Sequence, residues 1–324
     1  MTQASTFAME HLGEVKAARE RVRPHLRRTP LLTCDLDPGL LLKAECFQLT
    51  GSFKVRGAFN AILKIDPAAS RGVITASSGN HAQAVALAAR TAGLKATILI
   101  PEGANPMKIA ATRALGAEVI TEGVTMSNRD DLLAEAVERT GLTLVHPYDS
   151  WDVLHGQGTA ALEILEDRPD TAVIATPVGG GGLLSGTAIA ACAISPHTRV
   201  FGVEPELADD AYRSFTTGVL TRLDSAPGTM ADGVRTMSIG KRNFEVLVEK
   251  RLIEGIVTVT EDELQEALLT AWLRLKIALE PTGALPLAAY LAGKLPPGSA
   301  QSPTALILSG GNFDPRSMAT LLAQ

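Results

Sequence analysis

The chain has 324 residues, of which 46% are hydrophobic, and it carries 30 basic against 35 acidic side chains, a formal net charge of −5. That charge leaves no basic surface for nucleic acid, and the length suggests about two domains with a substantial core. The 3 cysteines are too few for a disulfide framework, and neither the N-terminus nor any apolar run suits a leader or a membrane span, so we expect a cytoplasmic protein.

Short apolar runs alternate with longer helical patterns along most of the chain. Strands are predicted over 72–76, 96–100, 117–120, 171–175, 199–203 and 305–308, and helices over 82–92, 108–115, 183–193 and 261–279. Thr260 and Glu263 form a capping-box pattern at the start of the last helix, and Pro281 with Gly283 is predicted to end it. This βαβ rhythm predicts an α/β fold of two lobes, each with a mostly parallel sheet flanked by helices. The smaller lobe, 72–146, is expected to be inserted into the larger one, 1–71 and 147–324.

Lys54 lies at the head of an apparent helix, in Thr50-Gly-Ser-Phe-Lys-Val-Arg-Gly57. A second segment, Gly179-Gly-Gly-Gly182, follows a predicted strand and opens a helix. A primary amine can condense with an aldehyde, and the backbone N–H groups of residues without side chains can approach phosphate oxygens closely. Together the two segments indicate a cofactor that carries both an aldehyde and a phosphate, which is pyridoxal 5′-phosphate (PLP).

Two further polar segments follow predicted strands. Ser77-Ser-Gly-Asn-His81 holds more small and polar residues than a helix N-cap requires, so we interpret it as part of a ligand site. Ser309-Gly-Gly-Asn312 follows the last predicted strand. A neutral hydroxyl there could hydrogen-bond a heteroaromatic nitrogen, and the same residues are also typical of an ordinary turn.

The glycine segment also fits a competing function. Gly180-x-Gly182-x-x-Ser185 is close to the dinucleotide-binding fingerprint, and Glu204 follows about twenty residues later, where a ribose-binding acid would lie. A nicotinamide-dependent dehydrogenase has no use for Lys54 or for the 77–81 segment, which argues against that function. The same two features argue against a non-catalytic sensor of PLP or nucleotide.

Taken together, GSFKVRGAFNAI, SSGNHAQA, PVGGGG and LSGGN resemble the fold type II PLP enzymes, and among them the threonine dehydratase and serine racemase family. The resemblance extends from Arg28-Thr-Pro-Leu31 to Ser309. It implies a dehydratase (ammonia-lyase) that converts a 3-hydroxy amino acid, by default L-threonine or L-serine, to a 2-keto acid and ammonia. Serine racemisation, or dehydration of hydroxyaspartate or of a bulkier aromatic substrate such as phenylserine, stays open as an alternative. A homodimer or homotetramer is also implied.

The resemblance implies a role for each motif residue. Lys54 would form the Schiff base with PLP and later accept the substrate's Cα proton, and Ser78 would exchange a proton on the opposite face of the cofactor. The other cofactor contacts would come from Phe53 at the ring, Asn80 at the ring hydroxyl, Gly179, Gly180, Gly181, Gly182 and Leu183 at the phosphate, and Ser309 at the pyridine nitrogen. The substrate carboxylate would lie among Ser77, Asn80 and His81, next to Ser78. Because a serine stabilises a protonated ring nitrogen less than an aspartate would, elimination of a β-hydroxyl is favoured over transamination.

Three further expectations concern the substrate side chain and a metal ion. Glu204, Ala208 and Asp210 match a cation site of the racemase-like members, in which two carboxylates and a backbone carbonyl bind Mg²⁺ or Ca²⁺; from spacing alone, a solvated acidic turn fits equally well. Arg129 aligns with an arginine that could pair with a second substrate carboxylate, and the alternative is a solvated helix arginine. Tyr148 differs from the asparagine or phenylalanine common in the family, which leaves a larger or aromatic substituent open.

Overall fold

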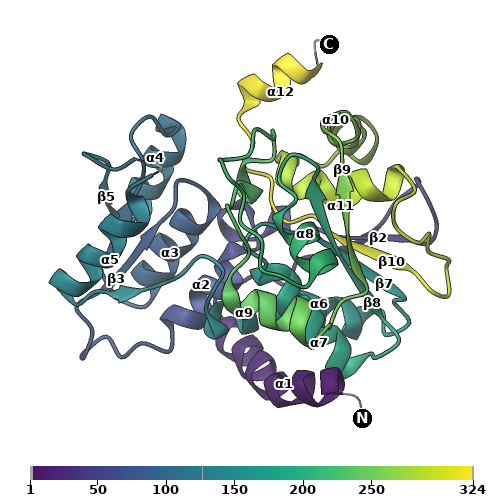
Figure 1. Ribbon diagram of the computed structural model, residues 1–324, viewed down its shortest axis with the longest axis horizontal. Coiled ribbons are helices and arrows are strands. Elements are labelled where there is room, and N and C mark those ends of the chain that lie inside the picture. The colour runs from purple at the N-terminus through teal and green to yellow at the C-terminus, as the bar shows by residue number, and fades with distance from the viewer. Residues whose placement is uncertain (1–2, 126, 323–324) are drawn as a thin grey trace.

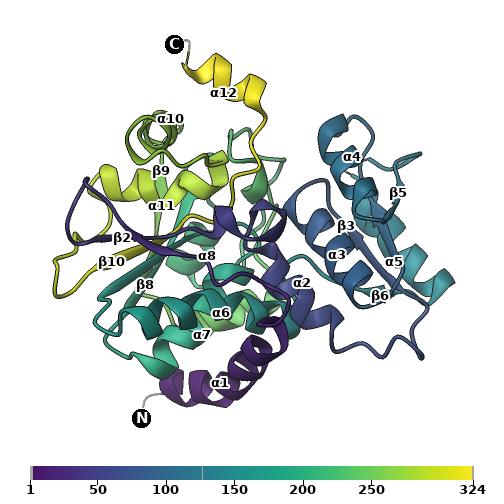
Figure 2. The same ribbon diagram turned by 180° about the vertical axis from the view of Figure 1, so that it is seen from behind.

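The computed structural model describes residues 3–125 and 127–322. The strands form two sheets that lie side by side, with α2 (Lys54–Ile62) between them (Figures 1 and 2). Within the described ranges, no helix is long and apolar enough to cross a membrane.

The larger sheet has the strand order β1-β2-β10-β7-β8-β9, in which β1 pairs antiparallel with β2 and the other neighbours pair in parallel. Its strands are β1 (Leu31–Thr33), β2 (Leu40–Lys43), β7 (Val173–Pro177), β8 (Arg199–Pro205), β9 (Gly255–Val259) and β10 (Thr304–Ile307). Strands β2, β7 and β10 are buried along their whole length, because helices cover both faces of the sheet.

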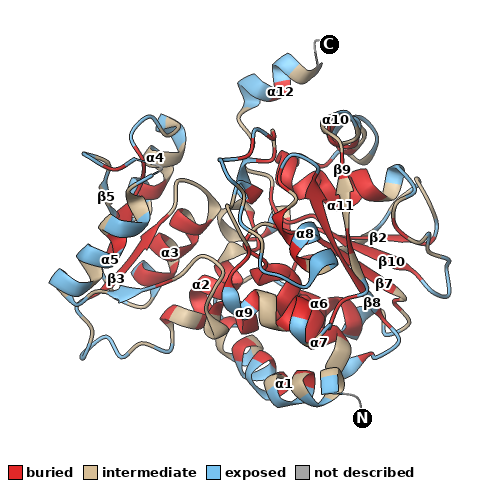
Figure 3. Ribbon diagram, viewed as in Figure 1, coloured by how far each residue is buried: buried red, intermediate tan, exposed pale blue. Residues whose placement is uncertain are grey.

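Alternate residues of each strand face different helices. Ile174 and Ile307 belong to a core shared with α1 (Gln3–Val22), α6 (Trp151–Asp167) and α7 (Gly182–Ile194). Ala175 and Leu306 belong to the opposite core, shared with α10 (Glu261–Thr270) and α11 (Pro281–Leu291). Figure 3 shows the buried strands between these helices and the exposed outer surface of α1.

The smaller sheet is entirely parallel, in the order β5-β4-β3-β6. Its strands are β3 (Val73–Ala76), β4 (Ala96–Leu99), β5 (Glu118–Ile120) and β6 (Thr143–Leu144), and its helices are α3 (Asn80–Thr91), α4 (Pro106–Ala114) and α5 (Arg129–Thr140). Helices α2 and α3 pack on one face and α5 on the other. The predicted α/β fold with two mostly parallel sheets is therefore confirmed. The domain limits stay a prediction, since Val55 and Phe59 of α2 add to the core of the smaller lobe.

One predicted element was wrong. Helix α10 continues as a π-helical turn, η5 (Ala271–Leu275), and ends at Lys276, whose φ of 60° is left-handed, so it does not reach residue 279. Pro281 begins α11 instead of ending the preceding helix, because a proline is tolerated in the first turn, where its missing N–H costs no hydrogen bond. The capping box of Thr260 and Glu263 is confirmed.

The remaining elements are short. They are η1 (Glu45–Phe47), η2 (Leu49–Gly51), α8 (Asp210–Thr217), η3 (Asp232–Val234), α9 (Lys241–Phe244), the π-helix η4 (Glu245–Glu249) and α12 (Pro315–Leu322). Helix α12 projects from the body of the molecule next to the C-terminus (Figure 1).

Candidate active site

One cavity, of about 180 Å³, collects every residue predicted to bind cofactor or substrate. These residues are Phe53, Lys54, Ser77, Ser78, Asn80, His81, Arg129, Gly179, Gly180, Gly181, Gly182, Leu183 and Ser309. They come from loops at the carboxyl ends of β3, β7 and β10 and from the starts of α2, α3, α5 and α7. Ligand sites in open α/β sheets lie at such strand ends.

Lys54 is the first residue of α2, and its side chain points into the cavity. Its Nζ donates to the Pro147 carbonyl at 3.0 Å and lies 5.2 Å from the centre of the Phe53 ring. Burial lowers the pKa of Lys54 to about 8, which raises the fraction of neutral, nucleophilic amine at neutral pH. The Phe53 N–H donates to the Ser309 carbonyl at 3.0 Å, so the amine is held beside the end of β10.

The glycine segment forms a loop between β7 and the N-terminus of α7. Gly181 has a φ of +95°, and a Cβ atom there would lie 2.8 Å from the Asn243 Cβ. A Cβ atom on Gly180 would lie 2.1 Å from the Tyr148 ring. The loop therefore has no room for side chains, and its backbone N–H groups together with the helix N-terminus suit an anion such as phosphate.

The 77–81 segment joins β3 to α3. Within the described residues, no side chain caps the N-terminus of α3, so Asn80 is not used as a helix cap. Burial lowers the pKa of His81 to about 3, and its neutral ring is hydrogen-bonded through Nε2 to the Val145 carbonyl at 3.0 Å. The segment therefore leaves the N-terminus of α3 open to a carboxylate in the cavity.

Ser309 lines the cavity with a buried hydroxyl that can bind a ligand. The residue is 1% exposed, and its Oγ has no hydrogen-bond partner among the residues that the structure describes. A buried hydroxyl without a partner is costly unless a ligand satisfies it.

Sequence reasoning missed Glu280, which also lines the cavity. The residue is 3% exposed, and burial raises the pKa of its carboxyl to about 7. Its Oε1 accepts a hydrogen bond from Asn80 Nδ2 at 2.6 Å. The local signal, a glutamate before Pro281, indicates a helix boundary and says nothing of this contact. Lys108 and Asp232, which form an ion pair at 2.5 Å, also line the cavity and were likewise missed.

The three residues of the predicted cation site lie outside the cavity, around the end of β8 and the start of α8. Glu204 is buried and accepts the N–H groups of Ala211 at 3.2 Å and Tyr212 at 2.8 Å. Asp210 is buried, and neither of its carboxylate oxygens has a partner in the described part of the chain. Burial raises the pKa of both carboxyls, and the charge of Asp210 raises the pKa of Glu204 further. Over residues 3–125 and 127–322, no group of three or more His, Cys, Asp or Glu side chains is arranged to hold a metal.

Residues 22–310 match the family model of the pyridoxal-phosphate dependent enzymes. The chain belongs to this family. The cavity fits its cofactor, because the buried Lys54 amine suits an aldehyde, the side-chain-free loop suits a phosphate and the buried Ser309 hydroxyl suits a ring nitrogen.

Relatives of this PLP enzyme carry several different names. A serine racemase of Dictyostelium discoideum is 39% identical over 96% of this chain and 97% of its own length. An L-threo-3-hydroxyaspartate ammonia-lyase of Pseudomonas sp is 42% identical, over 95% of this chain and 97% of its own. The crystal structure of a T.th. threonine deaminase is 48% identical, has a TM-score of 0.87 and covers 94% of this chain and 98% of the other. The resemblance to fold type II PLP enzymes is thereby confirmed.

Proposed function

We propose that this enzyme dehydrates a 3-hydroxy amino acid of the L-threonine or L-serine type and releases a 2-keto acid and ammonia. The observation that carries the proposal is the shared cavity that holds the Lys54 amine, the glycine loop and the 77–81 segment. The relatives named as a threonine deaminase and a hydroxyaspartate ammonia-lyase support the same reaction class.

Bound PLP supplies an aldehyde for covalent attachment and an electron sink for the bond at the substrate's Cα. Lys54 would hold the aldehyde, and the N–H groups of 179–183 would hold the phosphate. The Ser309 hydroxyl would face the ring nitrogen, and Phe53 would pack against the ring. A neutral hydroxyl at Ser309, unlike a carboxylate, would not favour a charged ring nitrogen, and so would favour loss of a β-hydroxyl over transamination.

Proton transfer would use the side chains that line the cavity. The Lys54 amine, whose pKa is low enough for it to be partly neutral, would take the Cα proton. The substrate carboxylate would be bound at the N-terminus of α3 by Ser77, Asn80 and His81. Ser78 is also on the cavity wall, which supports racemisation of serine as a second activity.

A second carboxylate on the substrate has one specific observation in its favour. Arg129 lines the cavity at the start of α5, where a guanidinium can bind a carboxylate with two parallel hydrogen bonds. Dehydration of hydroxyaspartate is therefore the second candidate. Tyr148, whose ring packs on Gly180 in the same cavity, would border the substrate side chain, and we keep a bulkier substituent such as that of phenylserine as a further alternative.

A substrate panel tests the proposal. Purified protein with PLP is incubated with L-threonine, L-serine, L-threo-3-hydroxyaspartate and phenylserine, and release of 2-keto acid and formation of D-serine are followed. Lys54→Ala should abolish turnover, whereas Lys16→Ala, which removes an exposed lysine of α1, should not. The proposal fails if no hydroxy amino acid yields a keto acid, or if Lys54→Ala turns over normally.

We also propose that Glu204, Ala208 and Asp210 bind Mg²⁺ or Ca²⁺ through two carboxylates and the Ala208 carbonyl. Two buried carboxylates repel each other, and a divalent cation would remove that cost. A chelator should lower the melting temperature and Mg²⁺ should restore it. A melting temperature indifferent to the chelator would reject the site.

The assembly and the compartment are further proposals. We propose a homodimer or homotetramer, as the family resemblance implies, which light scattering of the purified protein would test. We place it in the cytoplasm because Cys34, Cys46 and Cys192 are free thiols, as in a reducing compartment. Fractionation of the source cells would test that location.

A further inference from the structure

Three side chains link the loop after β10 to the loop after β3 and to the start of α11. Asn312 Nδ2 donates to Asn80 Oδ1 at 2.8 Å, and Asn80 Nδ2 donates to Glu280 Oε1 at 2.6 Å. Asn312 Nδ2 also donates to the Thr50 carbonyl at 2.7 Å, which fixes Asn312 as the donor of the pair. We call this series of bonds the Asn312–Asn80–Glu280 chain.

The Asn312–Asn80–Glu280 chain of hydrogen bonds determines which atoms of the Asn80 amide remain free. A primary amide offers two N–H donors and one carbonyl oxygen. The Asn80 oxygen is bonded to a donor, and one of its N–H groups is bonded to a carboxyl oxygen. Reversing the amide would place its NH₂ against the Asn312 donor, so that hydrogen bond would be lost, and would turn its oxygen toward Glu280, which has no proton to donate when it is ionised. The second N–H of Asn80 therefore has no partner in the described part of the chain and can bind a ligand in the cavity.

The surrounding backbone is shaped to leave room for the Glu280 carboxyl. A Cβ atom on Gly310 would lie 2.3 Å from Glu280 Oε1, so no larger residue fits there without moving the carboxyl. The Glu280 N–H donates to the Gly310 carbonyl at 3.1 Å, which ties the two loops together. Gly310, in the loop after β10, thus leaves space for the carboxyl and also bonds the backbone of the residue that carries it.

The groups that act electrostatically on Glu280 come from three other elements. They are Lys54 of α2, Lys108 of α4 and Asp232 of η3, and the Cys46 thiol of η1 is within reach of the same carboxyl. Burial raises the pKa of Glu280 to about 7, and Oε1 can accept the Asn80 N–H in either protonation state.

We propose that Glu280 and Asn312 are positioning residues that hold the Asn80 amide with an N–H group toward the ring oxygen of PLP, and so favour the ionised form of that oxygen. A hydrogen bond donated to the charged form lowers the pKa of an acid. This inference rests on the proposed function, in which Asn80 faces the ring hydroxyl.

The experiment titrates the visible absorbance of the PLP-bound protein, without substrate, between about pH 6 and 9. Glu280→Leu removes the acceptor of the Asn80 N–H, and Asn312→Ala removes the donor to its oxygen. Each should raise the apparent pKa of the bound cofactor by about one unit. Glu280→Gln keeps a carbonyl acceptor and should titrate like the unchanged protein.

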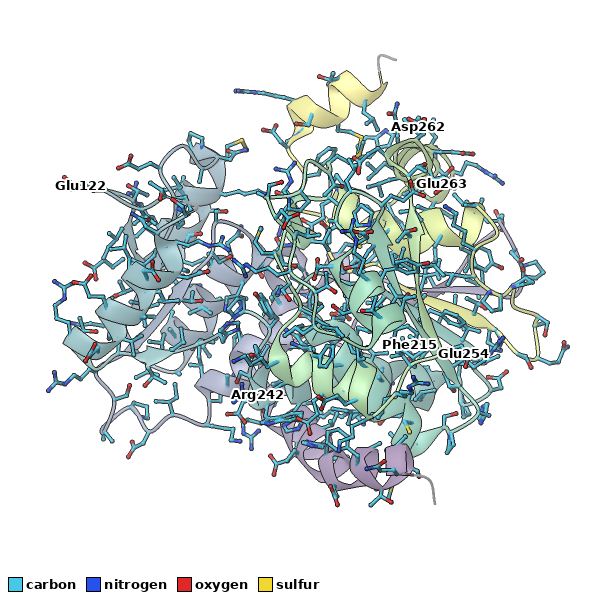
Figure 4. All side chains as sticks on the ribbon, in the orientation of Figure 1. Glu122, Phe215, Arg242, Glu254, Asp262 and Glu263 are labelled. Atoms are coloured by element: carbon cyan, nitrogen blue, oxygen red, sulfur yellow. The ribbon has the colours of Figure 1, made fainter. Side chains whose placement is uncertain are left out.

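A matched control is Glu263→Leu on α10, labelled in Figure 4. That carboxylate pairs with Lys294 at 2.6 Å and does not line the cavity, so its loss should lower stability without shifting the titration. Asn312→Ala carries the test alone if Glu280→Leu does not fold.

Two results would overturn the inference. In one, Glu280→Leu and Asn312→Ala bind PLP and titrate like the unchanged protein. In the other, Glu280→Gln shifts as far as Glu280→Leu, so that charge and not amide orientation is the cause. Failure of the unchanged protein to bind PLP would instead refute the proposed function on which the inference rests.

Discussion

Arg56 follows Lys54 by two residues, and two buried carboxylates hold its guanidinium. Its N–H groups donate to both Glu45 oxygens at 2.7 and 2.8 Å and to both Glu163 oxygens at 2.8 and 2.9 Å. Arg56 is 1% exposed, Glu45 0% and Glu163 6%. Because α2 begins at Lys54, this contact anchors the helix that carries the Lys54 amine.

Arg56→Met leaves Glu45 with a buried charge and without its ion-pair partner. Removing one partner of a buried ion pair costs about 3–5 kcal/mol, because the remaining charge is neither solvated nor paired. An unfolding entropy of about 2.1 cal/mol/K per residue over 324 residues gives about 0.7 kcal/mol/K. The melting temperature should therefore fall by about 4–7 °C. Retention of PLP should fall as well, since the start of α2 loses its anchor.

The control is Arg168→Met, the same substitution at an arginine that donates two hydrogen bonds to Asp170, at 2.8 and 2.7 Å. Its side chain is 31% exposed and that of Asp170 is 40% exposed, so the pair is worth less than about 1 kcal/mol. Thermal unfolding followed by circular dichroism compares the two variants, and PLP content is read from absorbance. Equal losses in melting temperature would show that burial does not raise the cost of losing the arginine.

Three further predictions concern the cofactor and the cation site. Gly180→Ala should weaken PLP binding by about 5- to 150-fold in equilibrium dialysis, the effect of an overpacking cost of about 1–3 kcal/mol, because the new Cβ would meet the Tyr148 ring at 2.1 Å. Unchanged affinity would contradict the phosphate site. The rate at which the cofactor-free protein captures PLP should rise with pH and level off near the Lys54 pKa of about 8, whereas capture that keeps rising toward 10.5 would mean an ordinary lysine. In chelator, stability should fall as pH rises above about 4, because the raised pKa values of Glu204 and Asp210 make the folded chain bind more protons than the unfolded one. Mg²⁺ should abolish this dependence of the melting temperature on pH. A melting temperature that does not change with pH in chelator would contradict the raised pKa values of Glu204 and Asp210.

Much of the cavity could be predicted because its residues occur in contiguous motifs at the ends of strands. A run of four glycines and the 77–81 segment are visible locally, and parallel strands bring their carboxyl ends to one edge. The lysine motif and the glycine run were enough to indicate PLP before any tertiary contact was known. Strands β3, β4, β7, β8 and β10 were found for a similar reason, since apolar runs buried on both faces are a strong local signal, whereas β1, β2, β6 and β9 were not predicted.

Glu280 could not be predicted in this way, because its role depends on a partner 200 residues away in the sequence. Burial, which raises its pKa, is likewise a property of the packed molecule. The end of α10 was misplaced for a related reason. The left-handed turn at Lys276 is a conformation that a lysine adopts only when the surrounding structure holds it there.

The Ser309-Gly-Gly-Asn312 segment shows how a weak motif becomes specific through packing. Ser309 offers a buried hydroxyl to the cavity, Gly310 leaves room for Glu280, and a Cβ atom on Gly311 would lie 2.7 Å from the Ala278 carbonyl. Asn312 reaches the smaller lobe through Asn80. Each residue of a common turn sequence thus meets a different constraint, and replacing any one of them should damage a different property: ring-nitrogen contact, carboxyl placement, loop packing or amide orientation. Asn80 follows a strand of the smaller sheet, and its partners Asn312 and Glu280 flank β10 and α11 of the larger lobe, so the bonds that orient the amide also join the two sheets' ligand-binding edges.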